Sequence, residues 1–345
     1  MEFIVDYGLF LAKTATLLVA LVALIGFIAA TLMRQRSLSP EHIEVKPLND
    51  RYRETSNVLR GAMLSKTAAK KLQKEDKKKR KSEEKQAKKQ APESRRRIFV
   101  LDFHGDIRGS EVALLREEIT AVLLVAGEQD EVLLRLESVG GMVHAYGLAA
   151  SQLARLRERN ISLTVSVDKV AASGGYLMAC VGQRILAAPF AIIGSIGVIT
   201  QIPNFSRLLK KHDIDYEQVT AGEFKRTITM FGETTDKARQ KLKEEVEETH
   251  ALFKDYVKEQ RPVLDLEQVA TGEYWLGTRA LALNLVDELR TSDDYLMEMH
   301  ESADLLEVRY VVKEKLSDKL FGVFTGFRRP SLITSMPHDE PTQLT

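Results

Sequence analysis

The feature that most constrains the fold is a repeated alternation of short apolar runs with amphipathic segments, beginning at residue 97. Apolar or β-branched runs occupy residues 97–103, 132–136 and 161–167. Between them, apolar residues recur at helical spacing over 111–125 and 146–157. Strands that alternate with helices in this way form a largely parallel sheet joined by right-handed crossovers. The sequence therefore predicts an α/β fold of stacked βα units.

The pattern continues through the second half of the chain. Strands are predicted at 197–201, 216–220 and 306–312, and helices at 204–211, 235–260 and 278–289. The helix at 235–260 is long and highly charged on one face.

An apolar run precedes this domain at residues 14–33, which contain no charged side chain. Its length matches the roughly 20 residues that a helix needs to cross a bilayer. A cleaved signal peptide is the alternative, but Glu2 and Asp6 stand where such a peptide is basic. We therefore predict a transmembrane anchor. Basic residues flank it on both sides, and the positive-inside rule favours a cytoplasmic downstream side only weakly, so the side stays open.

Residues 66–97 are dominated by Lys and Arg and have almost nothing apolar to bury. This stretch is either a solvated spacer or a segment attracted to anionic lipid headgroups. The predicted organisation is an anchor segment at 1–33, a basic juxtamembrane linker at 34–97, a folded α/β domain at 98–312 and a flexible tail at 313–345. The tail carries an amphipathic stripe suited to a membrane surface, a neighbouring subunit or its own domain, made of Leu316, Leu320, Val323, Phe324 and Phe327.

Composition excludes several classes of function. Lys and Arg (50) balance Asp and Glu (49), which argues against a nucleic-acid binder. Cys180 is the single cysteine, so neither an intramolecular disulfide nor a cysteine-based zinc cluster can form. No metal-binding or phosphate-binding motif is present in the sequence, and we expect no metal and no cofactor.

Ser173 is the first candidate for chemistry, because it follows a predicted strand and begins a short apolar helix with two glycines after it. Unpaired N–H groups at a helix start favour negative charge, although Ser-Gly-Gly alone is usually only a turn or a cap. A serine nucleophile needs a base. His104 and His144 are open candidates, and the other known solution is a lysine kept neutral by burial.

Four motifs occur in order along the chain: ESVGGMV at 137–143, AASGGY at 171–176, GSIGVI at 194–199 and AGEFKRT at 221–227. This set resembles the bacterial signal peptide peptidase A family of serine peptidases. The resemblance implies that Ser173 is the nucleophile, that Lys225 is the general base and that Ser195 orients the lysine amine. Arg226, beside the lysine, cannot serve as a base because guanidinium stays protonated.

An acyl-transfer site also needs two donors for the oxyanion, and we expect the backbone N–H groups of Gly174 and Gly141 to supply them. The chain departs from the family pattern at Val139, where proline is common, and at Asn284, where glycine is common. Asparagine tolerates the left-handed conformation of a helix end, so the fold should not change.

The resemblance further implies a ClpP/crotonase-like fold, a homo-oligomer and a single-pass protein of the bacterial inner membrane. Its substrates would be unstructured or hydrophobic peptides such as signal peptide remnants, with lipids contacted through the anchor. Two other functions remain open at this point. One is crotonase-type acyl-CoA chemistry, which uses the same two donors without a nucleophile, and the other is a non-catalytic membrane scaffold.

Overall fold

The computed structural model of the chain describes residues 8–10, 13–22, 24, 41–64, 78 and 95–312. The chain divides into two units, Met1–His42 with Val311–Thr345, and Ile43–Tyr310. The second unit contains nearly all of the sheet and every candidate site residue.

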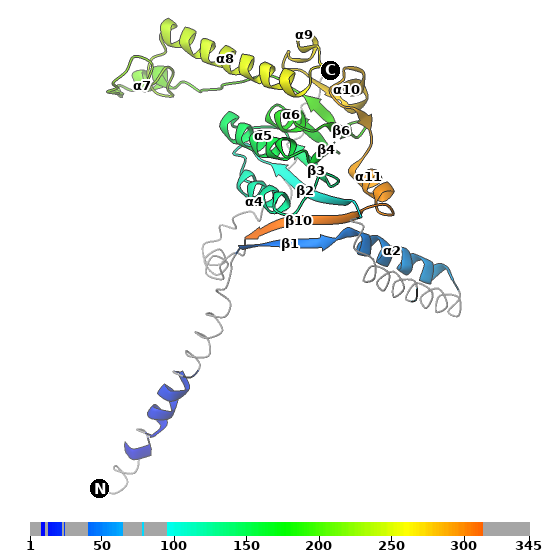
Figure 1. Ribbon diagram of the computed structural model, residues 1–345. Helices are drawn as coiled ribbons and strands as arrows, with labels where there is room; N and C mark the ends of the chain where they lie inside the picture. Colours follow the sequence, from blue (N-terminus) through cyan, green and yellow to red (C-terminus); the bar gives the residue numbers. More distant parts are fainter. Residues whose placement is uncertain are drawn as a thin grey trace. The chain divides into compact units, whose positions relative to one another are not determined.

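A parallel sheet forms the centre of this unit (Figure 1). The neighbouring strands, in order across the sheet, are β1 (Glu41–Pro47), β10 (Asp304–Val312), β2 (Arg97–Gly105), β3 (Glu131–Ser138), β4 (Ser162–Val167), β6 (Arg184–Ala187) and β9 (Glu288–Leu289). All pairings from β10 to β9 are parallel. Parallel strands need covering on both faces, which explains why these strands are nearly continuous apolar runs.

Three short strands branch from this path and carry the candidate site. They are β5 (Val170–Ala172), β7 (Ile192–Gly194) and β8 (Tyr274–Leu276). β5 pairs in parallel with β3 through Ser138 and Ala171, and with β7 along its whole length. β8 closes the branch as an antiparallel partner of β7.

Helices cover the two faces of the sheet with two separate apolar cores. α4 (Val112–Leu123), α5 (Val143–Glu158) and α6 (Gly174–Ala179) contribute to the larger core, together with alternate residues of β2, β3 and β4. α2 (Leu48–Met63) and α11 (Ser292–Met299) contribute to the smaller core on the other face. Two further described helices, α9 (Leu266–Val269) and α10 (Gly277–Ala282), lie near the branch.

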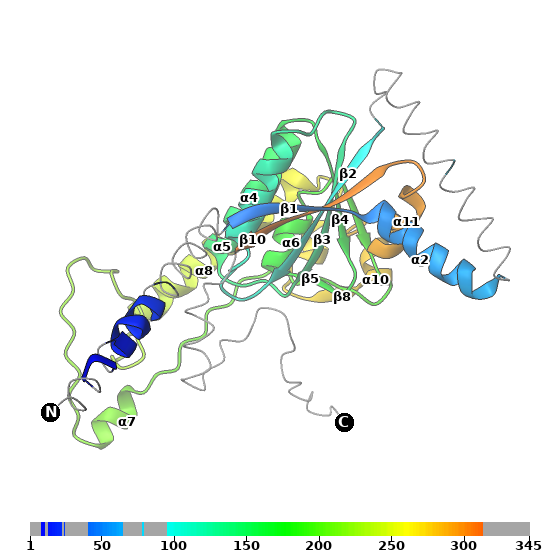
Figure 2. The same cartoon turned by 90° about the horizontal axis from the view of Figure 1, so that it is seen from below.

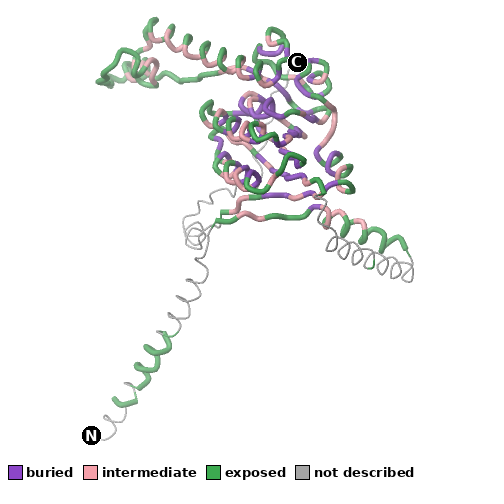
Figure 3. The backbone as a smooth tube through the Cα atoms, viewed as in Figure 1, coloured by how far each residue is buried: buried purple, intermediate pink, exposed green. Residues whose placement is uncertain are grey.

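α7 (Ser206–Lys211) and the first half of α8 (Asp236–Gln260) form an arm that projects away from the sheet (Figures 1 and 2). Contacts of the segment between them are local, such as the hydrogen bonds of Asn204 to Thr229 and Gly232 and the packing of Phe205 on Phe231. In contrast to the buried strands, this arm is largely exposed (Figure 3).

Much of the predicted α/β pattern is confirmed. The strands expected at 97–103, 132–136, 161–167 and 306–312 are β2, β3, β4 and β10, and their order is parallel as expected. Asn284 has a φ of 59°, so the left-handed conformation expected for it is also present.

Two predicted strands are wrong. Residues 197–201 and 216–220 have no strand structure. The chain leaves the sheet at Ser195, where φ is 49°, and residues 216–220 lie in the arm without a neighbouring strand to pair with. The structure also differs from a simple linker at 34–97, because β1 and α2 are folded there and Leu48 is buried.

Within the described residues, no helix combines the length and apolar character that crossing a bilayer requires. The predicted anchor at 14–33 lies partly outside the described residues. The basic stretch at 66–97 lies mostly outside them, and the tail at 313–345 lies wholly outside them.

A buried carboxyl group in α4 makes the stability of this unit depend on pH. Glu118 is 5% exposed and accepts a hydrogen bond from the backbone N–H of Tyr310 in β10 at 2.8 Å. Burial is the main cause that raises the pKa of Glu118 to about 7. The carboxylates of Glu111 and Asp102 raise it further, while the Tyr310 N–H and Arg309 lower it.

The folded chain holds the proton of Glu118 more tightly than the unfolded chain. The stabilisation that this proton gives the folded state is therefore fully present below pH 4.5, the ordinary pKa of glutamate, and is lost as pH rises to about 7. Glu118→Gln keeps an acceptor and carries no charge. We expect the variant to gain up to about 3 kcal/mol in unfolding free energy relative to the wild type between pH 4.5 and pH 8. Urea unfolding followed by the fluorescence of Trp275 measures this, and a constant difference across that range would contradict it.

Candidate active site

Ser173 stands at a strained turn between β5 and α6. Its φ of 52° and ψ of −119° lie in a region that residues other than glycine rarely adopt. The Ser173 N–H donates to the Gly194 carbonyl in β7 at 2.8 Å, which holds the turn in place. Among the described residues, the Ser173 Oγ has no hydrogen-bond partner, and the residue is half-buried. A strained serine on a strand-to-helix turn is the geometry that presents a nucleophile.

The glycine loop after β3 lies directly against this turn. A Cβ on Gly140 would come within 2.7 Å of the Gly174 nitrogen and 2.9 Å of the Ser173 Cβ, and Gly140 has a φ of +89°. A Cβ on Gly141 would lie 2.2 Å from the Ile107 carbonyl oxygen. Both positions therefore require glycine, because only a residue without a side chain lets these backbone segments meet.

The N–H groups around Ser173 divide into bonded and free ones. The Gly140 N–H donates to the Ser138 Oγ at 3.0 Å, and the Met142 N–H donates to the Ile107 carbonyl at 2.8 Å. Within the described part of the chain, the N–H groups of Gly141 and Gly174 have no acceptor. The structure thus brings the two predicted oxyanion donors to the same cavity as Ser173.

This cavity measures about 390 Å³, and its wall is mostly apolar. The apolar side chains come from α5, α6, α8 and the segment after β7, and they are Val143, Tyr146, Leu177, Val198, Ile199, Leu252, Phe253 and Tyr256. A cavity with such a wall suits an apolar side chain placed beside the serine.

The C-terminal end of α8, just after the turns that contribute to this wall, is fastened by an ion pair whose cation is buried. The Arg261 guanidinium is 7% exposed and donates to both oxygens of Asp287 at 2.8 and 2.9 Å, and to the Asn284 carbonyl at 2.8 Å. Asp287 also accepts the Ile185 N–H in β6 at 2.7 Å. The pair thereby ties the end of the helix to the sheet.

Breaking this pair leaves a buried cation without its partner. We expect Asp287→Asn to lower the unfolding free energy by about 2–3 kcal/mol, below the largest losses for buried pairs because Asp287 is 37% exposed. Glu247→Gln is a matched control on α8, where the pair with Lys243 is 3.6 Å long and exposed, and should cost less than about 0.5 kcal/mol. Equal losses in the two variants by chemical denaturation would refute this role of the pair.

Ser195 lies next to the serine turn, since Ala172 pairs with Gly194 across β5 and β7. Its φ is 49°, its N–H donates to the Glu273 carbonyl at 2.7 Å, and its Oγ donates to the Gly272 carbonyl at 3.3 Å. No lysine amine among the described residues is bonded to it.

Lys225 is not brought to Ser173 within a single chain. It is exposed in the arm, its backbone N–H donates to the Gly222 carbonyl, and its side chain is absent from the cavity wall. Its ammonium group has no hydrogen-bond or ion-pair partner among the described residues. The burial that a general-base lysine requires is therefore not found for Lys225 within one chain, because the arm around it has no core to receive the side chain.

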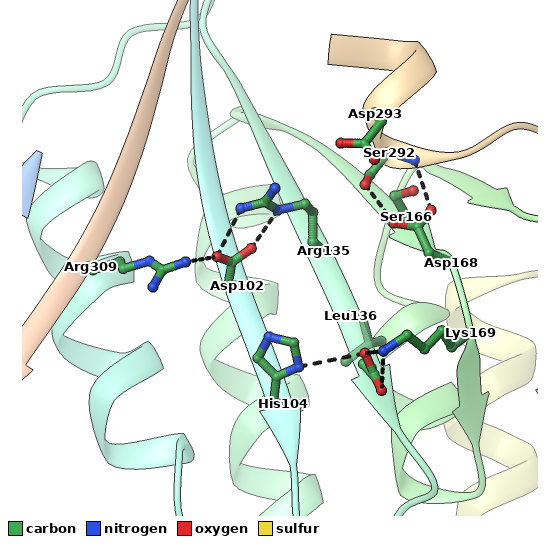
Figure 4. A pocket seen from close by; sticks show the side chains of 11 residues that line it. Asp102, His104, Arg135, Leu136, Ser166, Asp168, Lys169, Ser292, Asp293 and Arg309 are labelled. Atoms are coloured by element: carbon green, nitrogen blue, oxygen red, sulfur yellow. Dashed lines mark hydrogen bonds and ion pairs between the residues drawn. The ribbon is translucent and has the colours of Figure 1, made fainter. Parts of the chain in front are cut away.

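Neither histidine candidate reaches the serine. His144 is exposed at the start of α5 and does not line the cavity. His104 is 64% exposed and lies in another pocket, where its Nδ1 is 3.7 Å from Glu137 (Figure 4). Glu137 is itself paired with Lys169 at 2.9 Å.

This second pocket, of about 320 Å³, lies on the face of the sheet that carries the smaller core and is lined by charged side chains (Figure 4). Arg135 donates to Asp102 at 2.8 Å and to Glu307 at 2.9 Å, and Arg309 bonds to the same two carboxylates. Since these charges pair with one another, we interpret them as structural.

Two polar residues beside the site were not singled out from the sequence. Ser138 and Tyr146 are both buried and hydrogen-bonded to each other at 2.6 Å. A serine two residues before Gly140 and a tyrosine on the first turn of the next helix were the signals available. Neither residue type is distinctive enough to be noticed without the contact.

A strained serine, two free N–H groups and an apolar cavity at the ends of parallel strands are the features expected of an acyl-transfer site in an α/β protein. The chain belongs to peptidase family S49. The family model "Peptidase family S49 N-terminal" matches residues 2–153, and "Peptidase family S49" matches residues 155–306. The resemblance inferred from the four motifs is confirmed, and family membership supports a peptidase.

Similar proteins include the "Probable protease SohB" of Haemophilus influenzae, which is 50% identical over 325 residues. The matched region covers 92% of this chain and 92% of that protein. The protein of the same name from Buchnera aphidicola subsp. Acyrthosiphon pisum is 49% identical over 319 residues, covering 92% of this chain and 93% of its own. Among solved structures, a mutant of the 1510-N membrane-bound stomatin-specific protease in complex with a substrate peptide is 15% identical. Its TM-score is 0.41, with 68% of this chain and 100% of that chain covered.

Proposed function

We propose that the chain is a membrane-anchored serine endopeptidase with a Ser/Lys dyad. Ser173 is the nucleophile, Lys225 the general base, and Ser195 the residue that orients the lysine. The N–H groups of Gly141 and Gly174 receive the oxyanion. The observation that carries the proposal is the strained, unpartnered Ser173 between two free N–H groups at an apolar cavity.

In this mechanism, the Ser173 Oγ attacks the carbonyl carbon of a peptide bond while the neutral lysine amine takes the hydroxyl proton. Negative charge develops on the carbonyl oxygen and is stabilised by the two N–H donors. The protonated lysine then gives its proton to the leaving amine, and an acyl-enzyme remains. Water, deprotonated by the same amine, hydrolyses that ester and restores Ser173. The substrates are unstructured or hydrophobic peptides such as signal peptide remnants, and the cavity wall fits an apolar side chain next to the bond that is cleaved.

The dyad is completed by a second copy of the chain. The arm carries Lys225 and exposes apolar side chains that a single chain leaves in water, among them Leu208, Ile214, Tyr216, Val219 and Phe224. Such an unpaired apolar surface marks an interaction site. Docking the arm on a neighbouring copy would bury these side chains and desolvate the lysine, which favours its neutral form.

The remaining parts of the proposal concern location. Residues 14–33 anchor the chain in the bacterial inner membrane as a single span. Lipids are contacted through this anchor, and the catalytic domain has a ClpP/crotonase-like architecture. Crotonase-type acyl-CoA chemistry would use the same donors but has no use for a strained serine, and a scaffold has no use for the donors either. Covalent labelling of Ser173 by a fluorophosphonate probe discriminates the peptidase from both.

Ser173→Ala should lower peptide hydrolysis by at least about 10³-fold while folding and assembly stay intact, because a hydroxyl leaves little volume behind. Lys225→Ala should lose as much, and Lys225→Arg should not recover it, since guanidinium does not accept the proton. Lys243→Ala, an exposed lysine of α8, is the matched control and should keep full activity.

The two inactive variants also test how the dyad is assembled. If Lys225 acts on the serine of another copy, mixing Ser173→Ala with Lys225→Ala and allowing subunits to exchange should restore part of the activity. An exchanged mixture without activity would disprove assembly across copies.

The pH profile of kcat/KM should show one deprotonation whose limb rises from neutral to mildly alkaline pH, because a desolvated lysine, and not a histidine, accepts the proton. His104→Gln and His144→Gln should leave this limb in place. A limb centred at about 6.5, the ordinary histidine value, that vanishes in either variant would overturn the assignment of Lys225.

A further inference from the structure

A chain of buried hydrogen bonds connects the glycine loop to α5. The Gly140 N–H donates to the Ser138 Oγ at 3.0 Å, Ser138 and Tyr146 share a bond of 2.6 Å, and the Tyr146 hydroxyl donates to the Asp106 carbonyl at 2.9 Å. Ser138 is 2% exposed and Tyr146 is fully buried, so water does not compete for these groups.

The groups at the two ends of this series of hydrogen bonds determine which group donates in each bond. A carbonyl oxygen can only accept, so the single proton of the Tyr146 hydroxyl is used on Asp106. Ser138 must then donate to the tyrosine oxygen, which leaves a serine lone pair to accept the Gly140 N–H. Each group is satisfied in one arrangement only, and a network of this kind holds its members more firmly than isolated bonds do.

Tyr146 also contacts the other side of the site. A Cβ on Gly174 would lie 2.5 Å from the Cγ of the Tyr146 ring, so the ring packs against the backbone of Gly174. One side chain therefore touches both segments that carry the free donors. Its ring supports Gly174 directly, and its hydroxyl holds the loop of Gly141 through Ser138.

We infer that Ser138 and Tyr146 are positioning residues that orient the Gly141 N–H toward the oxyanion, an inference that rests on the proposed function. The loop needs such a restraint because two successive glycines are flexible and Val139 does not limit φ as a proline would. Because the Gly140 N–H is bonded to Ser138, the loop cannot turn that group toward the substrate. The Gly141 N–H stays without an acceptor, beside that of Gly174.

Tyr146→Phe and Ser138→Ala are the variants that test this role. A misoriented donor weakens only the transition state, so kcat should fall by about 10- to 100-fold, less than for outright loss of a donor. KM should change by less than about 2-fold, because the phenyl ring still lines the cavity. The inhibition constant of a peptide aldehyde, which adds to the Ser173 Oγ and places an oxyanion between the donors, should rise by the same factor as kcat/KM falls.

Two further readouts separate positioning from a loss of stability. The double variant should be no slower than the slower single variant, because either substitution interrupts the same chain of bonds. Amide hydrogen exchange in the segment 138–142 should be faster in both variants, with or without substrate. Tyr295→Phe is the matched control, a buried tyrosine on the other face whose hydroxyl donates to Glu131 at 2.7 Å. It should lower stability and leave kcat and the aldehyde constant unchanged.

Unchanged kcat and aldehyde inhibition in Tyr146→Phe, with an active wild type, would overturn the positioning role and leave the proposed function standing. The positioning role would also be overturned if the double variant lost kcat by the product of the two single losses, because residues of one chain of hydrogen bonds do not act independently. A wild-type chain that neither hydrolyses peptides nor reacts with the aldehyde would overturn the proposed function and, with it, this role. Faster exchange at 138–142 would then describe loop stability alone.

Discussion

The candidate site depends on one close approach, between the glycine loop that follows β3 and the serine turn that follows β5. The approach is possible because both segments leave a parallel sheet at its carboxyl edge, where β3 and β5 still pair through Ser138 and Ala171. A side chain on Gly140 would collide with the backbone at Gly174, so backbone meets backbone without an intervening layer. In such a contact the polar groups beside the serine come from the backbone, and the N–H groups of Gly141 and Gly174 have no acceptor among the described residues. The donors of the site are therefore a consequence of how the two turns pack.

This approach is accompanied by backbone strain, and the surrounding bonds offset it. Ser173 and Ser195 both have positive φ, and each has its N–H bonded to a carbonyl of the β7–β8 branch, at Gly194 and Glu273 respectively. Strain of this kind persists only where its surroundings over-determine it. α8 adds a second constraint, because its final turns line the cavity and are fastened to the sheet by Arg261 and Asp287, while its first turns belong to the arm. One rigid element thus connects the pocket for substrate to the segment that bears Lys225.

Sequence reasoning predicted those features that depend on local pattern, and it missed those that depend on tertiary contact. The strands β2, β3, β4 and β10 are recognisable because burial on both faces demands apolar runs, and the glycines of the two turns stand in recognisable motifs. Residues 216–220 have the same β-type composition but no partner strand, so composition alone misled there. The environment of Lys225 could not be predicted, since whether an amine is buried depends on what packs over the arm. Tyr146 looked like an ordinary helix residue, and only its bonds to Ser138 and Asp106 distinguish it.

Two pockets of the described domain show why unsatisfied groups are better guides to function than charge. Asp102, Arg135 and Arg309 line the polar pocket, but each is bonded to an opposite charge, and a ligand that used them would have to break these pairs before gaining its own. The cavity at Ser173 is mostly apolar, yet the serine hydroxyl and two N–H groups beside it have no partner among the described residues. These three groups face a half-buried cavity without a bond to the protein, so they are available to a ligand, whereas the paired charges of the other pocket are not. In the proposed mechanism, a substrate carbonyl accepts from the two N–H groups, and the bonds are strongest at the oxyanion stage, because charged acceptors form the stronger hydrogen bonds. The same atoms would therefore favour the transition state over the bound substrate.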